Sequence, residues 1–212
     1  GGVDLLPIPV STPGFDNAPY VSCAAWITKD PETGAQNVGC YRAQVKGRRR
    51  LGMNPSVDLR PGIYLHWLKY RELVRPMPAA LMIGGPPVVI YTAVQKLPDD
   101  VEELAVAGAL AGAPIRVVRC KTVDLTVPAE AEIVIEGLID TEWLEPEGPF
   151  GESHGYVNLQ EFNPFMEVTA ITYRRNAVLH SIISQVTPSE SSLIKKVAYE
   201  PLLLSHLRNN LG

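Results

Sequence analysis

Cysteine is scarce in this sequence, and its occurrences at Cys23, Cys40 and Cys120 are odd in number and widely spaced. No two of them have the short spacing of a zinc site, and an odd, scattered set argues against a framework of disulfide bonds. We therefore expect free thiols, as in a reducing cytosol, and predict a cytoplasmic protein.

Positive charge is not in excess either. Lys and Arg number 19 against 23 Asp and Glu, a formal net charge of −4, which argues against a nucleic-acid-binding surface. The one short basic run, residues 46–50, could contact a phosphate or another anion, but such a run is also typical of a solvated turn, which we expect here. No apolar run has the length of about 20 residues that a membrane span needs.

The hydrophobic content of 46% over 212 residues is enough for one large domain or two small ones with a real core. Four prolines within residues 1–19 predict an extended lead-in. The helical pattern that runs into the last residues and the abrupt start at Gly1 predict a chain cut from a longer polypeptide.

Hydrophobic periodicity predicts mostly strands. We expect a strand pattern broken by glycine and proline over 78–92, a loop over 51–62, and an Arg175-Asn176 turn. The other predicted strands are 20–29, 36–45, 115–120, 124–127, 131–139, 165–174 and 177–183, and the predicted helices are 63–74, 98–110 and 190–207. Many antiparallel strands with a few helices indicate an α+β fold, whose strands commonly curl into a barrel or sandwich.

Residues 145–156 form a loop that carries two acids, Glu147 and Glu152, five positions apart. The glycines and the proline between them give the backbone a fixed, irregular shape. Carboxylates held close together with restricted water can have their pKa values pushed apart, so that one site keeps a proton donor and a charged base. The alternative is a proline-rich connector with solvated acids, which the spacing alone favours because most surface loops have no catalytic role.

Further candidate residues are scattered through the chain. Asn37 and Arg42 lie an odd number of positions apart on the predicted strand 36–45, so a regular strand would place them on opposite faces unless a bulge at Gly39 intervenes. Oxygen-rich ligation would suit magnesium or manganese better than zinc. The possible metal ligands are Asn37, Asp58, His66 and Glu103. A dinucleotide fingerprint, a phosphate-loop lysine motif and a nucleophile elbow are all absent.

Three motifs in order resemble the UbiD-type reversible decarboxylases, which use prenylated FMN. They are residues 28–34 with 37–42, then residues 98–103 with Gly108, and finally residues 127–137 with 146–152 and 155–156. The resemblance runs from about Tyr20 to Ser184. It implies a mostly antiparallel split β-barrel of the flavin-reductase type at residues 20–188, flanked by a few helices. Residues 1–19 would then be the remnant of an N-terminal region, and residues 189–212 a helical linker toward a missing C-terminal domain.

The family's catalytic residues are an arginine between two acids, and by motif match these are Arg42, Glu147 and Glu152. The resemblance implies that Arg42 orients the substrate carboxylate in a bidentate fork and that Glu152 donates a proton to the new carbanion. Glu147 would keep Arg42 oriented. Phe150 would shape the pocket beside the flavin, and the cofactor would serve as the electron sink.

The resemblance also implies a cofactor site and a metal site. The metal, manganese or magnesium, would be held by Asn37, Glu103 and a third ligand that is either Asp58 or His66. A potassium ion often accompanies it in the family, near the loop that matches residues 92–95. The implied cofactor-binding residues are Asn37, Val38, Gly39, Cys40, Tyr41, Arg42 and Pro98.

The expected function is the reversible, non-oxidative decarboxylation of an aromatic or α,β-unsaturated acid by a carboxy-lyase. The alternative is a non-catalytic flavin-binding or assembly subunit with the same barrel. Expected partners are a small carboxylic acid, a flavin prenyltransferase of the UbiX type that supplies the cofactor, and further copies of the full-length protein. The fragment alone is expected to bind the cofactor weakly and to be inactive.

Overall fold

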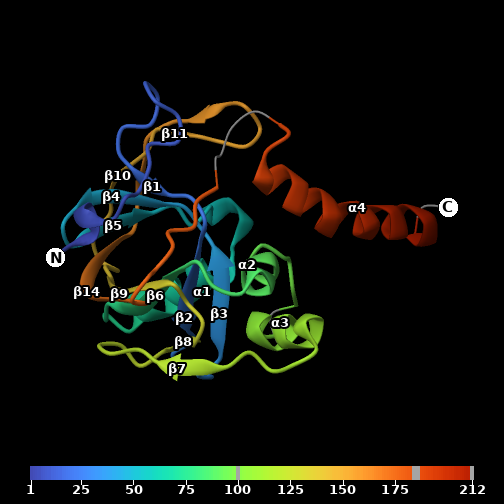
Figure 1. Ribbon diagram of the computed structural model, residues 1–212, viewed down its shortest axis with the longest axis horizontal. Helices are drawn as coiled ribbons and strands as arrows, with labels where there is room; N and C mark the ends of the chain where they lie inside the picture. The colour runs from blue at the N-terminus through green and yellow to red at the C-terminus, as the bar shows by residue number, and fades with distance from the viewer. Residues whose placement is uncertain (99–100, 183–186, 211–212) are drawn as a thin grey trace.

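The protein is built around one antiparallel sheet, shown in the computed structural model of Figure 1, which describes residues 1–98, 101–182 and 187–210. The strand order is β1-β4-β5-β14-β9-β6-β2-β3. These strands are β1 (Tyr20–Val21), β2 (Ala24–Lys29), β3 (Gln36–Cys40), β4 (Ala43–Gly47), β5 (Arg50–Met53), β6 (Met77–Ile83), β9 (Ile133–Ile139) and β14 (Phe165–Tyr173).

Two short connections show that this sheet is curled. β1 and β2 lie at the first and seventh positions of the sheet, yet only Ser22 and Cys23 separate them. β3 and β4 lie at the eighth and second positions, and only Tyr41 and Arg42 separate them. Each connection spans at most about 11 Å, so the two ends of the sheet must approach each other. The predicted α+β, mostly antiparallel fold is confirmed, as a half-barrel whose seam is crossed by Arg42.

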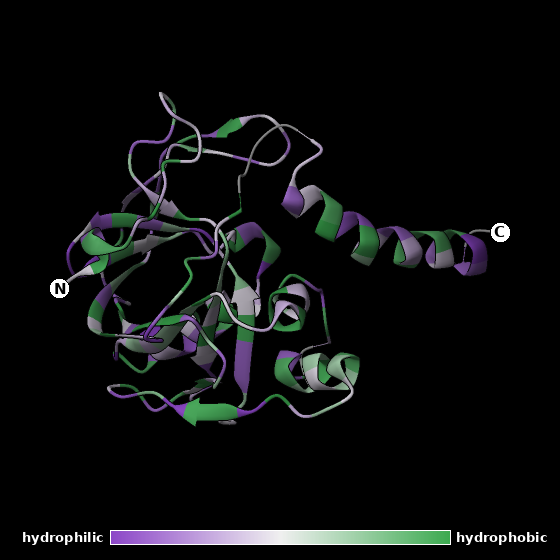
Figure 2. Cartoon of the chain, viewed as in Figure 1, coloured by the Kyte–Doolittle hydropathy of each residue, from purple (hydrophilic) through white to green (hydrophobic). Residues whose placement is uncertain are grey.

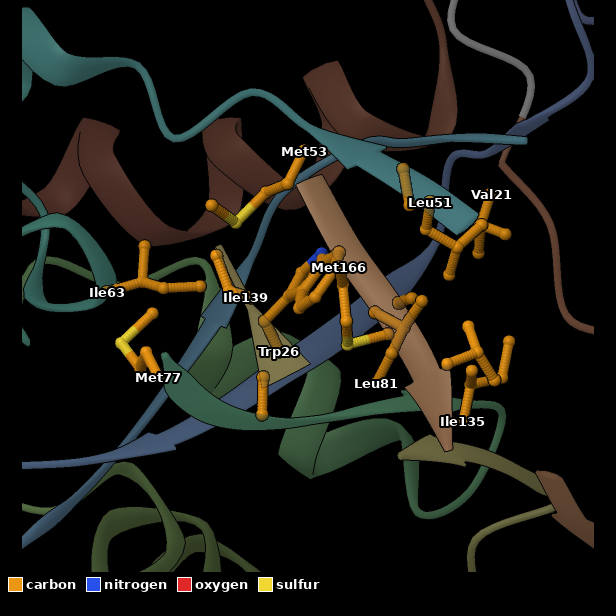
Figure 3. Close-up of a cluster of buried hydrophobic side chains, with 14 of the residues drawn as sticks. Val21, Trp26, Leu51, Met53, Ile63, Met77, Leu81, Ile135, Ile139 and Met166 are labelled. Atoms are coloured by element: carbon orange, nitrogen blue, oxygen red, sulfur yellow. The ribbon is translucent and has the colours of Figure 1, made fainter. Parts of the chain in front are cut away.

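Alternating side chains of the strands fill two cores. The inner core holds Trp26 and Leu81, and the close-up in Figure 3 shows them among the side chains of several strands. The ring of Trp26 is fully buried, and its Nε1 donates to the carbonyl oxygen of Tyr41 at 2.9 Å. Ala25 and Met82, on the opposite face, belong to the second core. β2 and β6 are therefore buried on both faces, which explains their nearly continuous apolar sequences.

Helices close the barrel and cover its outer face. α1 (Gly62–Glu72) contributes Ile63 and Trp67 to the inner core, and α2 (Pro87–Ala93) and α3 (Glu103–Ala111) pack on the second core. Two 3₁₀ turns, η1 (Val3–Leu5) and η2 (Val57–Leu59), complete this part. The remaining strands form short ribbons: β7 (Val117–Arg119) with β8 (Thr126–Pro128), β10 (Glu145–Glu147) with β13 (Glu161–Asn163), and β11 (Phe150–Gly151) with β12 (Val157–Asn158).

The last helix, α4 (Glu190–Asn210), confirms the helix predicted for 190–207 and extends it by three residues. It leaves the body of the molecule, and apolar and polar residues alternate along it (Figures 1 and 2). Its Tyr199 hydroxyl donates to the carbonyl oxygen of Val94 at 2.9 Å. None of the described helices is long and apolar enough to cross a membrane.

The predicted strand 36–45 is wrong as one element. β3 ends at Cys40 and the chain then crosses to β4, so Arg42 lies on a connection and not on a strand. No bulge occurs at Gly39, because it pairs in regular register with Trp26. The strand-like sequence pattern continues from β3 into β4. It could not reveal that the two strands lie toward opposite edges of the sheet.

Three other local predictions need correction. The loop predicted for 51–62 contains β5, which is paired on both sides, with β4 and β14. Residues 87–93 form α2 and not a strand, because Pro86 and Pro87 suit the first turn of a helix, where no N–H partner is needed. The helix predicted for 98–110 begins at Glu103 in the structure, and residues 99–100 lie outside the described part.

The Arg175-Asn176 turn is confirmed, but the strand predicted after it is not: residues 177–182 form no strand, and residue 183 lies outside the described part. Hydrogen bonds from its backbone to side chains hold this segment in place, and not the strand pairing that was expected. The N–H of Val178 donates to Glu132 Oε2 at 3.1 Å, and the Ser22 hydroxyl bonds both the N–H and the carbonyl of Ile182. Ala177 and Leu179 pack on the inner core, which accounts for the apolar pattern that suggested a strand.

The basic run at 46–50 includes the expected turn, at residues 48–49, but its ends belong to β4 and β5. Its last residue, Arg50, pairs with Glu145 at 2.5 Å and also with Glu167. The run is therefore engaged with neighbouring acids on the surface of the barrel.

Glu136 of β9 gives a first prediction, on stability. Its carboxylate is buried and accepts hydrogen bonds from the N–H of Lys121 at 2.8 Å and from the N–H and hydroxyl of Thr122 at 2.6 and 2.8 Å. Glu136→Leu would remove the acceptor of all these bonds, two of which come from backbone N–H groups, so we expect the free energy of unfolding to fall by about 2–4 kcal/mol. Urea denaturation measures this.

Glu130→Leu is the matched control for that substitution. Glu130 pairs with Arg116, whose side chain is 80% exposed, and an exposed pair contributes at most about 1 kcal/mol. Equal destabilisation by the two substitutions would contradict the structural role of Glu136.

Candidate active site

The acid loop folds as the two short ribbons β10–β13 and β11–β12. Glu147 is the last residue of β10, and Glu152 follows directly after β11. Gly148 joins the ribbons with a φ of 93°, which few other residues adopt, and a cis peptide follows it to Pro149. The interpretation of this stretch as a connector with solvated acids is wrong for Glu147, because its side chain is fully buried.

Arg42 lies between the two acids. Its Nε and Nη2 donate to Oε1 and Oε2 of Glu147 at 2.8 and 2.7 Å, and its Nη1 donates to Oε1 of Glu152 at 2.7 Å. The exposed fractions of the side chains are 8% for Arg42, 0% for Glu147 and 26% for Glu152. The guanidinium also lies over the ring of Phe150, 5.0 Å from its centroid. The three residues singled out in the sequence are thus brought together, on the seam of the barrel.

The guanidinium of Arg42 stays protonated between the two acids. Burial alone would lower the pKa of its guanidinium, but the hydrogen bond and charge of Glu147, together with the charge of Glu152, raise it above its usual value. Arg42 is therefore a permanent cation. Burial and the charge of Glu147 also raise the pKa of the Tyr20 hydroxyl, so the phenol stays protonated beside the pair.

Residues of the lead-in hold the backbone of the acid loop. Asp16 Oδ1 accepts from the N–H of Gly151 at 2.8 Å, and Asn17 Nδ2 donates to the carbonyl of Gly148 at 2.7 Å. The Tyr20 hydroxyl accepts from the N–H of Gly148 at 3.1 Å. Sequence reasoning missed Asp16, Asn17 and Tyr20, because nothing in a proline-rich segment indicates which distant loop it contacts.

A cavity of about 540 Å³ lies beside β3, the edge strand of the sheet. Gly39 permits its shape, since a side chain at this position would overlap the ring of Tyr41. Of the predicted cofactor-binding residues, Cys40 and Arg42 do not line the cavity. The other five, Asn37, Val38, Gly39, Tyr41 and Pro98, do line it.

The cavity can receive an anionic cofactor. Its volume lies in the range of about 300–1,000 Å³ that is usual for small-molecule sites. Arg60, Lys69 and Lys96 supply positive charge on its walls, and Lys69 is already paired with Asp30 at 2.7 Å. Arg60 and Lys96 have no acid partner within the described residues, so they are the cations best suited to a phosphate.

Two predicted metal ligands, Asn37 of β3 and Glu103 of α3, line this cavity. Oε2 of Glu103 accepts from the N–H of Val38 at 2.9 Å, and burial raises the pKa of this carboxyl. Asn37 is the next residue along the strand, and its buried Nδ2 has no hydrogen-bond partner. Half a rotation of this amide would direct its oxygen to the same position, where it could bind a cation.

The two options for the third ligand lie in different places. His66 lines the same cavity, and its Nδ1 is bonded to the Thr28 hydroxyl at 2.9 Å, with Thr28 directly opposite Asn37 in the β2–β3 pair. Burial lowers the pKa of His66, so the imidazole is neutral at pH 7, as a metal ligand must be. Asp58 is exposed in η2 and does not line the cavity.

Two oxygen donors and one imidazole fit manganese or magnesium. Within residues 1–98, 101–182 and 187–210, no group of three or more His, Cys, Asp or Glu side chains could hold a metal. A metal here would therefore depend on the Asn37 amide.

Comparison with known proteins adds independent evidence. The family model described as the 3-octaprenyl-4-hydroxybenzoate carboxy-lyase Rift-related domain of UbiD matches residues 2–186. Among solved structures, an evolved dimeric form of the UbiD-class enzyme HmfF from Pelotomaculum thermopropionicum, in complex with prFMN, is 40% identical. That match covers 97% of this chain and 46% of that chain, with a TM-score of 0.88.

Two more solved structures are similar. Vanillic acid decarboxylase from Sedimentibacter hydroxybenzoicus, in its closed form, is 31% identical, with 84% of this chain and 38% of that chain covered and a TM-score of 0.81. The 3,4-dihydroxybenzoic acid decarboxylase from Klebsiella pneumoniae is 29% identical, with 90% and 40% covered and a TM-score of 0.78. The present chain spans less than half the length of these three solved chains.

Proposed function

Because this chain belongs to the UbiD family of carboxy-lyase-related proteins, we propose that it is the cofactor-binding part of a reversible, non-oxidative decarboxylase. The substrate class is an aromatic or α,β-unsaturated carboxylic acid. The similar HmfF structure in complex with prFMN and the two similar aromatic-acid decarboxylases support this assignment.

The observation that carries the proposal is the arginine held between two acids. Guanidinium has five N–H donors, and three of them bond Glu147 and Glu152, which leaves two for a substrate carboxylate. Glu147, buried and bonded through both oxygens, fixes the plane of the Arg42 side chain. Arg42 can then orient a carboxylate through two parallel hydrogen bonds.

Glu152 is the proton donor in this proposal. Its side chain is 26% exposed, so it can exchange protons with solvent, whereas Glu147 is fully enclosed. A proton on Glu152 also makes the cluster of one cation and two carboxylates neutral. The proton passes to the carbon that loses carbon dioxide, and Glu152 is left as a carboxylate.

The cavity beside β3 would hold prenylated FMN, with Asn37, Val38, Gly39, Tyr41 and Pro98 on its walls. Cys40, at the end of β3, and Arg42, two residues later, do not line this cavity but would contact the cofactor from beyond it. When bound, the cofactor would supply the electron sink for the developing carbanion. Supply of the cofactor by a flavin prenyltransferase, a potassium ion near residues 92–95, homo-oligomers and a cytoplasmic location stay predictions. The division into residues 1–19, 20–188 and 189–212 is likewise proposed.

A manganese or magnesium ion would be held by Asn37, Glu103 and His66. Glu103→Gln replaces the one charged ligand. Loss of an outer-shell partner already costs about tenfold or more in metal affinity, so we expect the affinity for Mn²⁺ to fall by at least about tenfold. Electron paramagnetic resonance titration with Mn²⁺ measures this without turnover. The exposed neighbour Glu102 provides the control Glu102→Gln, and equal effects of the two substitutions would exclude the assignment of Glu103.

The function is tested by incubating the protein with prenylated FMN and a panel of aromatic and α,β-unsaturated acids while carbon dioxide is measured. Both this chain and the complete polypeptide that carries it are assayed, because we expect this part alone to bind the cofactor weakly and to be inactive. Carbon dioxide release by the complete polypeptide supports the proposal. Flavin binding without release from any acid would favour the alternative, a non-catalytic flavin-binding or assembly subunit.

A further inference from the structure

The two acids that flank Arg42 differ in their remaining contacts. Glu147 bonds Arg42 through both oxygens, at 2.8 and 2.7 Å. Its Oε2 also faces the side-chain amides of Asn54 at 3.4 Å and Asn163 at 3.5 Å. Both oxygens of this buried carboxylate are therefore occupied by donors, and neither is open to a reacting group.

Glu152 is bonded at one oxygen only. Its Oε1 accepts from Arg42 Nη1 at 2.7 Å and from Asn158 Nδ2 at 2.9 Å, while no donor contacts Oε2 within the described residues. Asn158 is well placed for this contact because it pairs with Phe150 across the β11–β12 ribbon. Glu152 lies two residues after Phe150, so the acid and the amide project from the same face.

We propose that Asn158 is a positioning residue for proton transfer, because its amide holds Oε1 of Glu152 and leaves Oε2 as the atom that carries the proton. This inference rests on the proposed function, in which Glu152 supplies that proton. In the transfer, the O–H bond at Oε2 breaks, a C–H bond forms at the carbon that lost carbon dioxide, and the electron pair stays on Glu152 as a carboxylate. Solvent then returns the proton to Oε2, since the Glu152 side chain is 26% exposed.

The charged and titratable groups around Glu152 are few. Arg42 faces it from the connection between β3 and β4, and Glu147 lies beyond Arg42 on β10. Tyr20 of β1 interacts with Arg42 from the other side. His154, two residues after Glu152, is engaged by the backbone N–H of Tyr156 at 3.2 Å. The amide of Asn158 is thus the neutral contact that can be altered without changing the charge of the cluster.

The test uses Asn158→Leu, which keeps the shape of the side chain and removes the donor. Carbon-13 NMR of labelled glutamate carboxyls reports the surroundings of Glu152 in the unloaded chain at a fixed pH, with Glu152→Gln identifying its signal. Because the Asn158 amide donates to Oε1 of Glu152 at 2.9 Å, its loss should move this carboxyl signal. Asn176→Leu, in the exposed turn after β14, is the matched control and should shift nothing.

Turnover provides the second readout. We expect kcat at its optimum to fall about tenfold with KM nearly unchanged, and Asn158→Gln, which keeps an amide donor, to recover part of kcat.

The outcomes separate this inference from the function on which it rests. An unchanged Glu152 carboxyl signal in folded Asn158→Leu protein overturns the role of Asn158, whatever the turnover. A changed signal in a protein whose wild type releases no carbon dioxide supports the contact and overturns the proposed function.

Discussion

Glu152→Gln should reduce kcat by about a hundredfold to ten-thousandfold, the range typical for loss of a positioned acid. The amide keeps the shape of the carboxylate and can still accept a hydrogen bond from Arg42 Nη1, now 2.7 Å from Oε1. It cannot deliver a proton to a carbanion. Binding of the flavin should therefore persist, and its absorbance spectrum should match that of the wild type.

The control for this substitution is Glu161→Gln. Glu161 lies opposite Glu147 in the β10–β13 pair but is exposed and has no contact with Arg42 within the described residues. Its variant should keep wild-type rates. A Glu152→Gln protein with wild-type turnover would show that the proton comes from another group.

Arg42→Leu should lower the free energy of unfolding by about 3–5 kcal/mol, because it leaves the buried carboxylate of Glu147 without its cation. Turnover should also be lost, since no other described cation lies between the two acids. Urea denaturation measures the stability. The affinity of the variant for a substrate-like carboxylate, compared with that of the wild type, measures how much Arg42 contributes to carboxylate binding.

A double substitution separates the cost of an unpaired charge from the value of the pair. In Arg42→Leu with Glu147→Leu, neither charge remains, so the protein should be more stable than the single Arg42→Leu variant. Lys29→Met is the surface control, because its partner Asp124 is 93% exposed and the pair contributes at most about 1 kcal/mol. A double variant less stable than the single one would contradict this account of Arg42.

Sequence reasoning identified the acid loop because its glycines, proline and paired acids are local features. It also predicted Arg42 as the partner of Glu147 and Glu152, through the order of the motifs. It could not predict how Arg42 reaches them. The connection that carries Arg42 joins the eighth strand of the sheet to the second, and strand pairing of that kind is decided by tertiary contacts.

Sequence reasoning missed other residues of the site for the same reason, because their contacts depend on tertiary structure. Asp16, Asn17 and Tyr20 hold the acid loop by hydrogen bonds across more than 120 positions, and Asn158 contacts Glu152 only because two short strands pair. Nor could periodicity distinguish the helix at 87–93 from a strand, since a short apolar run fits both. His66 lines the cavity and Asp58 does not, a difference that spacing along the sequence does not encode.

Exchange of labelled carbon dioxide into a substrate carboxylate tests the central claim most directly. The complete polypeptide, loaded with prenylated FMN, is incubated with an unlabelled acid and carbon-13 bicarbonate, and the acid is analysed by mass spectrometry. We predict that the label enters the carboxylate with the wild type and not with Arg42→Leu or Glu152→Gln. Tight flavin binding without any label in the acid, over the whole panel of aromatic and unsaturated acids, would contradict the account.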